Sequence, residues 1–299
     1  MNKKIGIIGA GNMGFPIARN LLKDGWQVRI YNRTASKLKP LKKLGAIIVH
    51  SPEDVCEPGG IVLSIVANDR VLESLTLKNT QFAKRLGKGG THFSLSTISP
   101  DTARRIAKAH KKYGVAYLGS PVFGRPEAAA ARKLWFCISG SRVAKKRVKP
   151  LIDALGQGVF DFGEDPGAAN VVKLAGNFLL MSAIEALGEA LALGQKNGIA
   201  RAKLAGMLTA TLFNCPAYYS YGKKLADETY DKVGFALPLG MKDAHLVLAS
   251  AAKSKVKMPL AKLIEKRFGV LMKRNPEKID WSALGMLASE EAGLVSGKK

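Results

Sequence analysis

The first half of the chain alternates between two patterns of apolar and polar positions. A short apolar run at 5–8 is followed by a helical pattern over 15–23, in which apolar residues share one face. Gly25 stops that pattern, and a second strand-like run follows at 27–31. These segments predict one βαβ unit, the building block of a doubly wound parallel sheet.

The alternation continues to residue 162. We expect further strands at 47–49, 61–66, 92–96, 115–118, 134–139 and 159–162, and helices over 52–57, 71–86, 100–113 and 143–155. The composition then breaks at Gly163-Glu164-Asp165-Pro166-Gly167. The sequence therefore predicts an α/β Rossmann dinucleotide-binding domain over 1–163, followed by an all-α domain over 164–299.

The second half shows helical patterns only. Residues 168–196 are rich in Ala, Leu, Met and Glu and hold no proline, which predicts one interdomain helix about 44 Å long. Further helices are expected over 202–212, 216–227, 239–252, 258–269 and 281–291. Helices as apolar as Phe178–Met181 favour a homodimer through this half, with a well-packed monomer as the alternative.

A glycine motif follows the first apolar run and opens the first helix. Gly9 permits a tight turn, Gly11 lets the backbone approach a pyrophosphate, and Gly14 lets the helix lie close to the strand. Such a motif is weak by itself in a chain with 31 glycines. Its place between a strand and a helix makes Gly9 to Gly14, with Asn12 and Met13 between them, a predicted cofactor site.

The end of the second strand indicates which dinucleotide is bound. An NAD site usually carries Asp or Glu there for the ribose 2′-hydroxyl, whereas this chain has Asn32, Arg33 and Thr34. A carboxylate would repel a 2′-phosphate, and Arg33 supplies a charged donor for one. The sequence favours NADP (NADPH) over NAD.

The net charge of +24 has two interpretations. Basic clusters such as 145–149 and 253–257 could bind nucleic-acid phosphates, or they could be solvated faces that also attract an anionic cofactor and substrate. We favour the second interpretation, because no aromatic-interleaved basic strand or helix-turn-helix pattern accompanies the charge. Nucleic acid is expected to bind only non-specifically.

Cysteine content and hydropathy bear on the compartment. The three cysteines are far apart, which predicts neither a disulfide framework nor a metal site. No uncharged apolar run of 18 residues and no signal-peptide pattern occur. We therefore expect a cytoplasmic protein without a membrane partner.

Two pairs of polar residues are candidates for chemistry. Lys173 and Asn177 are spaced i and i+4 on the long helix, so they share a face in apolar surroundings. Ser96 and Thr97 follow a predicted strand, and ligands bind at strand ends in doubly wound sheets. Spacing alone would leave Lys173 as a solvated surface lysine.

Together these motifs closely resemble the β-hydroxyacid dehydrogenase family within the 6-phosphogluconate dehydrogenase-like superfamily. That family includes 3-hydroxyisobutyrate dehydrogenase and the tartronate, glyoxylate and succinic semialdehyde reductases. The resemblance rests on the segments Gly9–Gly14, Tyr31–Thr34, Ser96–Pro100, Lys173 with Asn177, and Pro238–Asp243. It covers nearly the whole chain.

The resemblance implies hydride transfer between a nicotinamide cofactor and a small anionic aldehyde, keto acid or hydroxy acid. Lys173 would then be the general acid and base, with Asn177 beside it. Val66 and Thr97 would lie near the cofactor, and Lys242 would reach it. Ser96 and Thr97 would bind the substrate.

Among the departures from the family's pattern, one falls in the segment that binds the substrate. Where the family usually reads Pro-Val-Ser-Gly-Gly and binds a carboxylate, this chain has Pro121-Val122-Phe123-Gly124-Arg125. Phe123 cannot replace a serine donor, although Gly124 still offers a backbone amide. Either Arg125 binds a carboxylate bidentately or Phe123 lines a more apolar pocket.

Two other functions are compatible with the same fold. Related imine reductases share the architecture but generally replace the catalytic lysine. A non-catalytic anion or nucleic-acid binding protein would use the positive charge instead. Lys173 argues against both, and we expect an NADP-dependent dehydrogenase or reductase acting on CH–OH groups.

Overall fold

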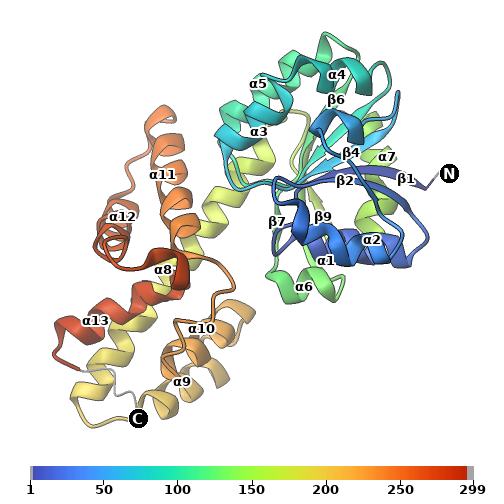
Figure 1. Ribbon diagram of the computed structural model, residues 1–299. Coiled ribbons are helices and arrows are strands. Elements are labelled where there is room, and N and C mark those ends of the chain that lie inside the picture. Colours follow the sequence, from blue (N-terminus) through green and yellow to red (C-terminus); the bar gives the residue numbers. More distant parts are fainter. Residues whose placement is uncertain (1–2, 295–299) are drawn as a thin grey trace. The chain divides into compact units, whose positions relative to one another are not determined.

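The computed structural model describes residues 3–294, which form two compact units divided between Lys173 and Leu174. The first is a sheet flanked by helices and the second is helical (Figure 1). This confirms the expected Rossmann domain followed by an all-α domain.

The first unit alternates strands and helices along the chain. Its strands are β1 (Lys4–Ile8), β2 (Gln27–Tyr31), β3 (Ile47–Ile48), β4 (Ile61–Ser64), β5 (Thr91–Ser94), β6 (Ala116–Gly119), β7 (Val122–Phe123), β8 (Leu134–Gly140) and β9 (Gly156–Asp161). Its helices are α1 (Gly14–Lys23), α2 (Lys39–Lys43), α3 (Asp69–Thr76), α4 (Thr80–Leu86), α5 (Pro100–Lys111), α6 (Pro126–Ala130) and α7 (Arg142–Leu155).

The strand order is β3-β2-β1-β4-β5-β6-β8-β7, with β9 paired to β8. The strands β3 to β6 of this order run parallel, whereas β8 is antiparallel to β6 and to β7. The order reverses at β1, since β2 lies on one side of it and β4 on the other. Loops that leave β1 and β4 therefore flank a switch point, where ligands bind in such sheets.

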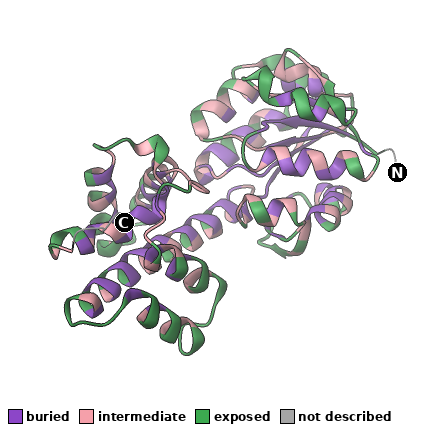
Figure 2. Cartoon of the chain, turned by 60° about the horizontal axis from the view of Figure 1, so that its bottom comes forward, coloured by how far each residue is buried: buried purple, intermediate pink, exposed green. Residues whose placement is uncertain are grey.

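Both faces of the sheet are covered. Ile5, Ile7 and Val28 point to a core shared with α1 and α7, whereas Ile8 and Val62 point to a core shared with α4. This period of two follows from the pleat of a strand buried on both sides. In Figure 1 α3, α4 and α5 gather on one side of the sheet and α1 and α2 on the other, and Figure 2 shows the strands between them buried.

Some expected elements of the first unit need correction. The helix predicted over 71–86 is two helices, because Asn79 begins α4 by accepting the backbone N–H of Gln81. Residues 52–55 form a 3₁₀ turn rather than a helix over 52–57. The short elements β7, α2 and α6 were not predicted, since two to five residues carry no readable periodicity.

The second unit is built on α8 (Ala168–Lys196), the long helix expected at these residues, most of which lies in this unit. The others are α9 (Arg201–Ala210), α10 (Pro216–Ala226), α11 (Leu237–Lys253), α12 (Pro259–Leu271) and α13 (Met286–Glu291). The helix expected over 281–291 is instead a 3₁₀ turn, Trp281–Gly285, followed by α13.

Close packing explains why α8 belongs to this core. A Cβ atom on Gly188 would lie 2.4 Å from the Cα of Gly285, so two backbones meet there without side chains between them. Within residues 3–294 α8 is the one helix long and apolar enough to cross a membrane. Its residues Met181, Ile184 and Leu191 are, however, buried in the helical core.

Candidate active site

The first glycine loop lies at the carboxyl edge of the sheet, between β1 and α1. Gly9 has a φ of +102°, and a Cβ atom there would lie 2.2 Å from the carbonyl oxygen of Ile65. A Cβ atom on Gly14 would lie 2.1 Å from the carbonyl oxygen of Gly9. Both glycines are therefore required for the turn and for the close approach of α1.

The same loop fits a dinucleotide diphosphate. A Cβ atom on Gly11 would meet no atom within 4 Å, so the backbone of this exposed residue can be approached closely. No side chain caps the amino end of α1 at Met13, and no acidic residue lies in its first turn. Its N–H groups can therefore face an anion. Asn12 is exposed beside Gly11.

The three residues after β2 divide into one loop tie and two exposed groups. Asn32 Oδ1 accepts the backbone N–H of Ala10 at 3.0 Å, and Asn32 Nδ2 donates to the carbonyl of Thr34 at 2.9 Å. This side chain thus fixes the glycine loop to the end of β2. Arg33 and Thr34 are exposed, and Arg33 has no ion-pair partner in the described chain.

The loops after β4 and β5 are also tied together. Ser96 is buried, and its Oγ accepts the backbone N–H of Val66 at 2.9 Å. Thr97, next to it, is half-buried. The structure therefore brings together Val66 and Ser96, which the sequence placed near cofactor and substrate, and engages the Ser96 hydroxyl in holding the loop.

Lys173 is a buried residue of α8 and not a solvated surface lysine. Its side chain is 9% exposed, and its Nζ lies 3.9 Å from the centroid of the Phe123 ring, over the ring face. Gly124 follows with a φ of +137°, and the Arg125 side chain is 31% exposed, with its Nε 4.0 Å from the Glu127 carboxylate. Phe123 of the departing segment 121–125 thus lies beside the lysine.

Two polar contacts fix the amino end of α8 in the first unit. Ser139 Oγ accepts the backbone N–H of Ala169 at 3.1 Å, and Asn170 Oδ1 accepts that of Ile98 at 3.5 Å. Asn170 is buried, and its Nδ2 has no hydrogen-bond partner in the described chain. These anchors set the position of Lys173, which follows on the same helix.

In the second unit a carboxylate that the sequence reading did not assign joins two predicted residues. Asp243, which is fully buried, accepts a hydrogen bond from Asn177 Nδ2 at 2.5 Å and pairs with Lys242 Nζ at 2.8 Å. Lys242 and Asp243 both belong to the segment Pro238–Asp243 that carries the family resemblance, but Asn177 lies 66 residues before Asp243 in the chain. Only the fold joins them.

Family models cover both units. Residues 4–163 match the NAD binding domain of 6-phosphogluconate dehydrogenase, and residues 167–287 match the NAD-binding of NADP-dependent 3-hydroxyisobutyrate dehydrogenase. The chain belongs to the β-hydroxyacid dehydrogenase family. It is therefore an oxidoreductase with an NAD(P)-binding domain, as the motifs predicted.

Individual members of the β-hydroxyacid dehydrogenase family match over nearly their full length. The chain is 37% identical to the uncharacterized oxidoreductase YfjR of Bacillus subtilis, covering 94% of this chain and 98% of that protein. It is 31% identical to a 3-hydroxyisobutyrate dehydrogenase of Pseudomonas aeruginosa, covering 95% and 97%. A 3-hydroxyisobutyrate dehydrogenase structure from Salmonella typhimurium, 26% identical, superposes with a TM-score of 0.84 over 95% of this chain and 99% of the other.

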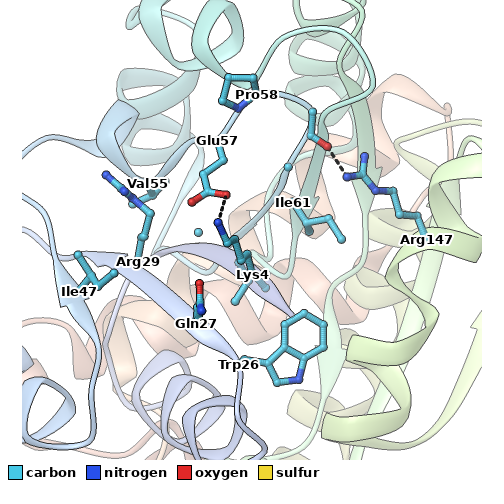
Figure 3. A pocket seen from close by; sticks show the side chains of 14 residues that line it. Lys4, Trp26, Gln27, Arg29, Ile47, Val55, Glu57, Pro58, Ile61 and Arg147 are labelled. Atoms are coloured by element: carbon cyan, nitrogen blue, oxygen red, sulfur yellow. Dashed lines mark hydrogen bonds and ion pairs between the residues drawn. The ribbon is translucent and has the colours of Figure 1, made fainter. Parts of the chain in front are cut away.

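A cavity of about 260 Å³ opens at the opposite, amino-terminal edge of the sheet (Figure 3). Lys4 and Glu57 form an ion pair at 3.7 Å inside it, and Arg147 donates to the carbonyl oxygen of Gly59. Lys4, Glu57 and Arg147 are thus paired with other groups of the lining. Cofactors of such sheets bind at the carboxyl ends of the strands, which lie at the other edge. We therefore assign this cavity no part in the reaction.

Proposed function

We propose that the protein is an NADPH-dependent reductase that interconverts a small aldehyde or keto acid and its hydroxy acid. The observation that carries this proposal is the buried Lys173, whose ammonium is held at the face of Phe123. Reduction of a carbonyl needs a proton donor, and in this family of hydroxyacid oxidoreductases we assign that role to the Lys173 ammonium.

The chain's own residues account for the cofactor preference. Gly9, Gly11 and the amino end of α1 would bind the diphosphate, and exposed Arg33 would bind the 2′-phosphate that only NADP carries. No carboxylate stands after β2 to repel that phosphate. When bound, NADPH supplies a hydride to the carbonyl carbon of the substrate.

Proton transfer falls to Lys173. One N–H bond of its ammonium breaks as the O–H bond of the alcohol forms, and the nitrogen keeps the electron pair; oxidation of the alcohol runs the same step backwards. Asp243 holds the amide group of Asn177 in one orientation. We assign Asn177 to orienting the substrate, and Ser96, Thr97, Gly124 and Arg125 to binding it.

Turnover measurements test the proposal. Purified protein is offered a panel of small semialdehydes and keto acids with NADPH or NADH, and cofactor oxidation is followed by absorbance. We expect turnover of at least one substrate, faster with NADPH at low cofactor concentration. No turnover of any carbonyl, with turnover of cyclic imines instead, would assign the fold to imine reduction; binding of nucleic acid without either turnover would indicate a binding protein.

We also propose a cytoplasmic homodimer formed through the helical unit. Leu179, Leu193 and Leu212 of that unit are 66%, 69% and 89% exposed, and a dimer interface would bury side chains of this kind. Sedimentation at micromolar concentration should give twice the chain mass of 32.0 kDa. A monomer at that concentration would contradict the dimer.

A further inference from the structure

The contact between Lys173 and Phe123 joins two elements that are each fixed. Phe123 belongs to β7 and lies opposite Trp135 in the antiparallel pair with β8. The helix that carries Lys173 is anchored by Ser139 and Asn170. The 3.9 Å between Nζ and the ring centroid is therefore set by the fold of the first unit alone.

The surroundings make this cation–π contact stronger than one on the surface. Lys173 is 9% exposed, and a desolvated cation gains more from an aromatic face than a hydrated one. Burial raises the pKa of the Cys137 thiol although the nearby charge of Lys173 acts to lower it, so the thiol stays neutral. The ring attracts the ammonium and not the neutral amine, so the contact positions the proton-bearing form.

The same segment lacks polar side chains where it passes the lysine. Phe123 has no hydrogen-bond donor or acceptor in its side chain. A Cβ atom on Gly124 would lie 2.8 Å from Leu134 Cδ2 and 3.1 Å from Ala128 Cβ, so the next position cannot take a polar side chain either. A substrate carbonyl at Lys173 would meet an apolar ring on this side.

We propose that Phe123 positions the Lys173 ammonium and selects carbonyl substrates with an apolar, rather than hydroxylated, substituent next to the carbonyl. This inference rests on the proposed reductase function. It makes Phe123 a positioning and specificity-determining residue: a methyl group packs on the ring, whereas a hydroxyl would lose its hydrogen bonds to water there.

The positioning half is tested without cofactor or turnover. Protein labelled with [ε-¹³C]lysine is studied by NMR, and the Lys173 signal is assigned by its loss in Lys173→Met. An ammonium stem over a ring face should show its ε-CH₂ signal displaced upfield. In Phe123→Leu the chemical shift of this signal should move to that of the other lysines. In Phe123→Tyr it should stay displaced upfield. A Lys173 signal that does not respond to removal of the ring would overturn the positioning role.

Kinetics test the same contact under turnover. Phe123→Leu should lower kcat about tenfold, a loss of about 1.4 kcal/mol, while the Kd for NADPH stays as it was. Phe123→Tyr should recover most of the lost kcat, because the ring face returns. Phe160→Leu on β9 is the matched control, since it removes an exposed ring of the same unit and should change neither constant. A kcat for Phe123→Leu equal to that of the unmodified protein would contradict the proposal.

A matched pair of substrates tests selection. Two semialdehydes with the same three-carbon backbone, which carry either a methyl or a hydroxyl group on the carbon next to the aldehyde, are compared by kcat/KM. The protein should prefer the methyl compound by about tenfold or more, and Phe123→Ser, which adds a hydroxyl, should reduce or reverse that ratio. An unchanged ratio in Phe123→Ser would overturn the specificity role.

The two failures can be told apart. If the protein reduces no carbonyl, the proposed function fails and the selection half fails with it, whereas the NMR result still decides the contact. If the protein is active but neither the signal nor the substrate ratio responds to Phe123, only this inference fails. Preserved circular dichroism and NADPH binding show that each variant is folded.

Discussion

The two units bury polar side chains in opposite ways. The sheet unit buries neutral histidines: His92 Nε2 is 2.8 Å from Ser64 Oγ, and His92 Nδ1 is 3.0 Å from His110 Nε2. The helical unit buries carboxylates beside cations, with Asp280 near Lys224 at 2.9 Å and Glu185 paired with Arg267.

The difference follows from how each architecture satisfies its backbone. Neighbouring strands are joined by backbone hydrogen bonds, so a sheet does not need buried ion pairs to hold its elements together. Helices satisfy their own backbones, so contacts between helices and loops fall to side chains. Asp280 shows this directly, since its Oδ2 accepts the N–H groups of Gly234 and Phe235 at 2.9 and 3.0 Å. The helical unit therefore buries ion pairs where the sheet unit buries a pair of neutral histidines.

Removing Asp280 should have the largest effect on stability. Although its burial acts to raise the pKa of Asp280, the backbone N–H of Phe235, the Ser282 hydroxyl and the Lys224 ammonium keep that pKa low, so the carboxylate is charged and paired. Asp280→Ala would leave Lys224 and three backbone N–H groups without the carboxylate, and should lower the free energy of unfolding of the helical unit by about 3–5 kcal/mol. Urea unfolding measures it.

The control for that variant is Asp231→Ala, an exposed carboxylate of the same unit, which should change stability by less than about 0.5 kcal/mol. Trp281 fluorescence, in a protein carrying Trp26→Phe and Trp135→Phe, reports the helical unit alone. If Asp280→Ala and Asp231→Ala unfold at the same urea concentration, buried charge does not stabilise this unit.

Lowering the pH should change the stability of the two units in opposite directions. Burial lowers the pKa of His110 to about 4 and that of His92 well below its usual value, so the folded sheet unit resists protons that the unfolded chain takes up near pH 6.5. Its stability should fall as pH drops from 6.5 towards 4, by about 3 kcal/mol from His110. His50→Gln, at an exposed histidine, should leave this fall unchanged.

Glu185 should act in the opposite direction. Burial raises the pKa of Glu185 to about 7 despite Arg267, so the folded form keeps a proton that the unfolded chain loses at lower pH. Its contribution is complete below the unfolded pKa and is lost as pH rises through 7. As the pH falls from 7 to 5, the sheet unit should lose stability while the helical unit gains it. Trp26 fluorescence reports the first change and Trp281 fluorescence the second. Parallel changes would refute the contrast.

The smallest expected effect is that of Arg33→Ala on the affinity of the sheet unit for its cofactor. Arg33→Ala should raise the Kd for NADPH about tenfold, since a charge-assisted bond to the 2′-phosphate is lost, and should leave the Kd for NADH nearly unchanged. Lys43→Ala removes the same charge from an exposed position on α2 and serves as the control. Equal loss with both cofactors would show that Arg33 acts only through net charge.

Local signals explain what the sequence could predict. The turn at Gly9, the close approach at Gly14 and the bounds of α8 each depend on residues near one another in the chain, and periodicity or a motif reports them. The break between α3 and α4 was missed because the apolar pattern runs on through Asn79, whose cap is a single side chain.

Long-range contacts explain what it could not. Phe123 and Lys173 are 50 residues apart, and Asn177 and Asp243 are 66 apart, so no spacing rule links either pair. The resemblance selected Lys173 and Asn177, and Phe123 was known only as a departure from the family's serine; its place at Lys173 came from the structure. Asp243 was visible only as the neighbour of Lys242. The departures from a family pattern are thus where the structure adds most.

The central claim is that Lys173 donates the proton, and amine rescue tests it most directly. Lys173→Ala should lower kcat by about 10² to 10⁴ with NADPH still bound, and added ethylamine should restore part of that loss in proportion to its concentration. Lys173→Arg should recover little, because a guanidinium holds its protons too tightly. Retention of most reductase activity by Lys173→Ala would contradict the account.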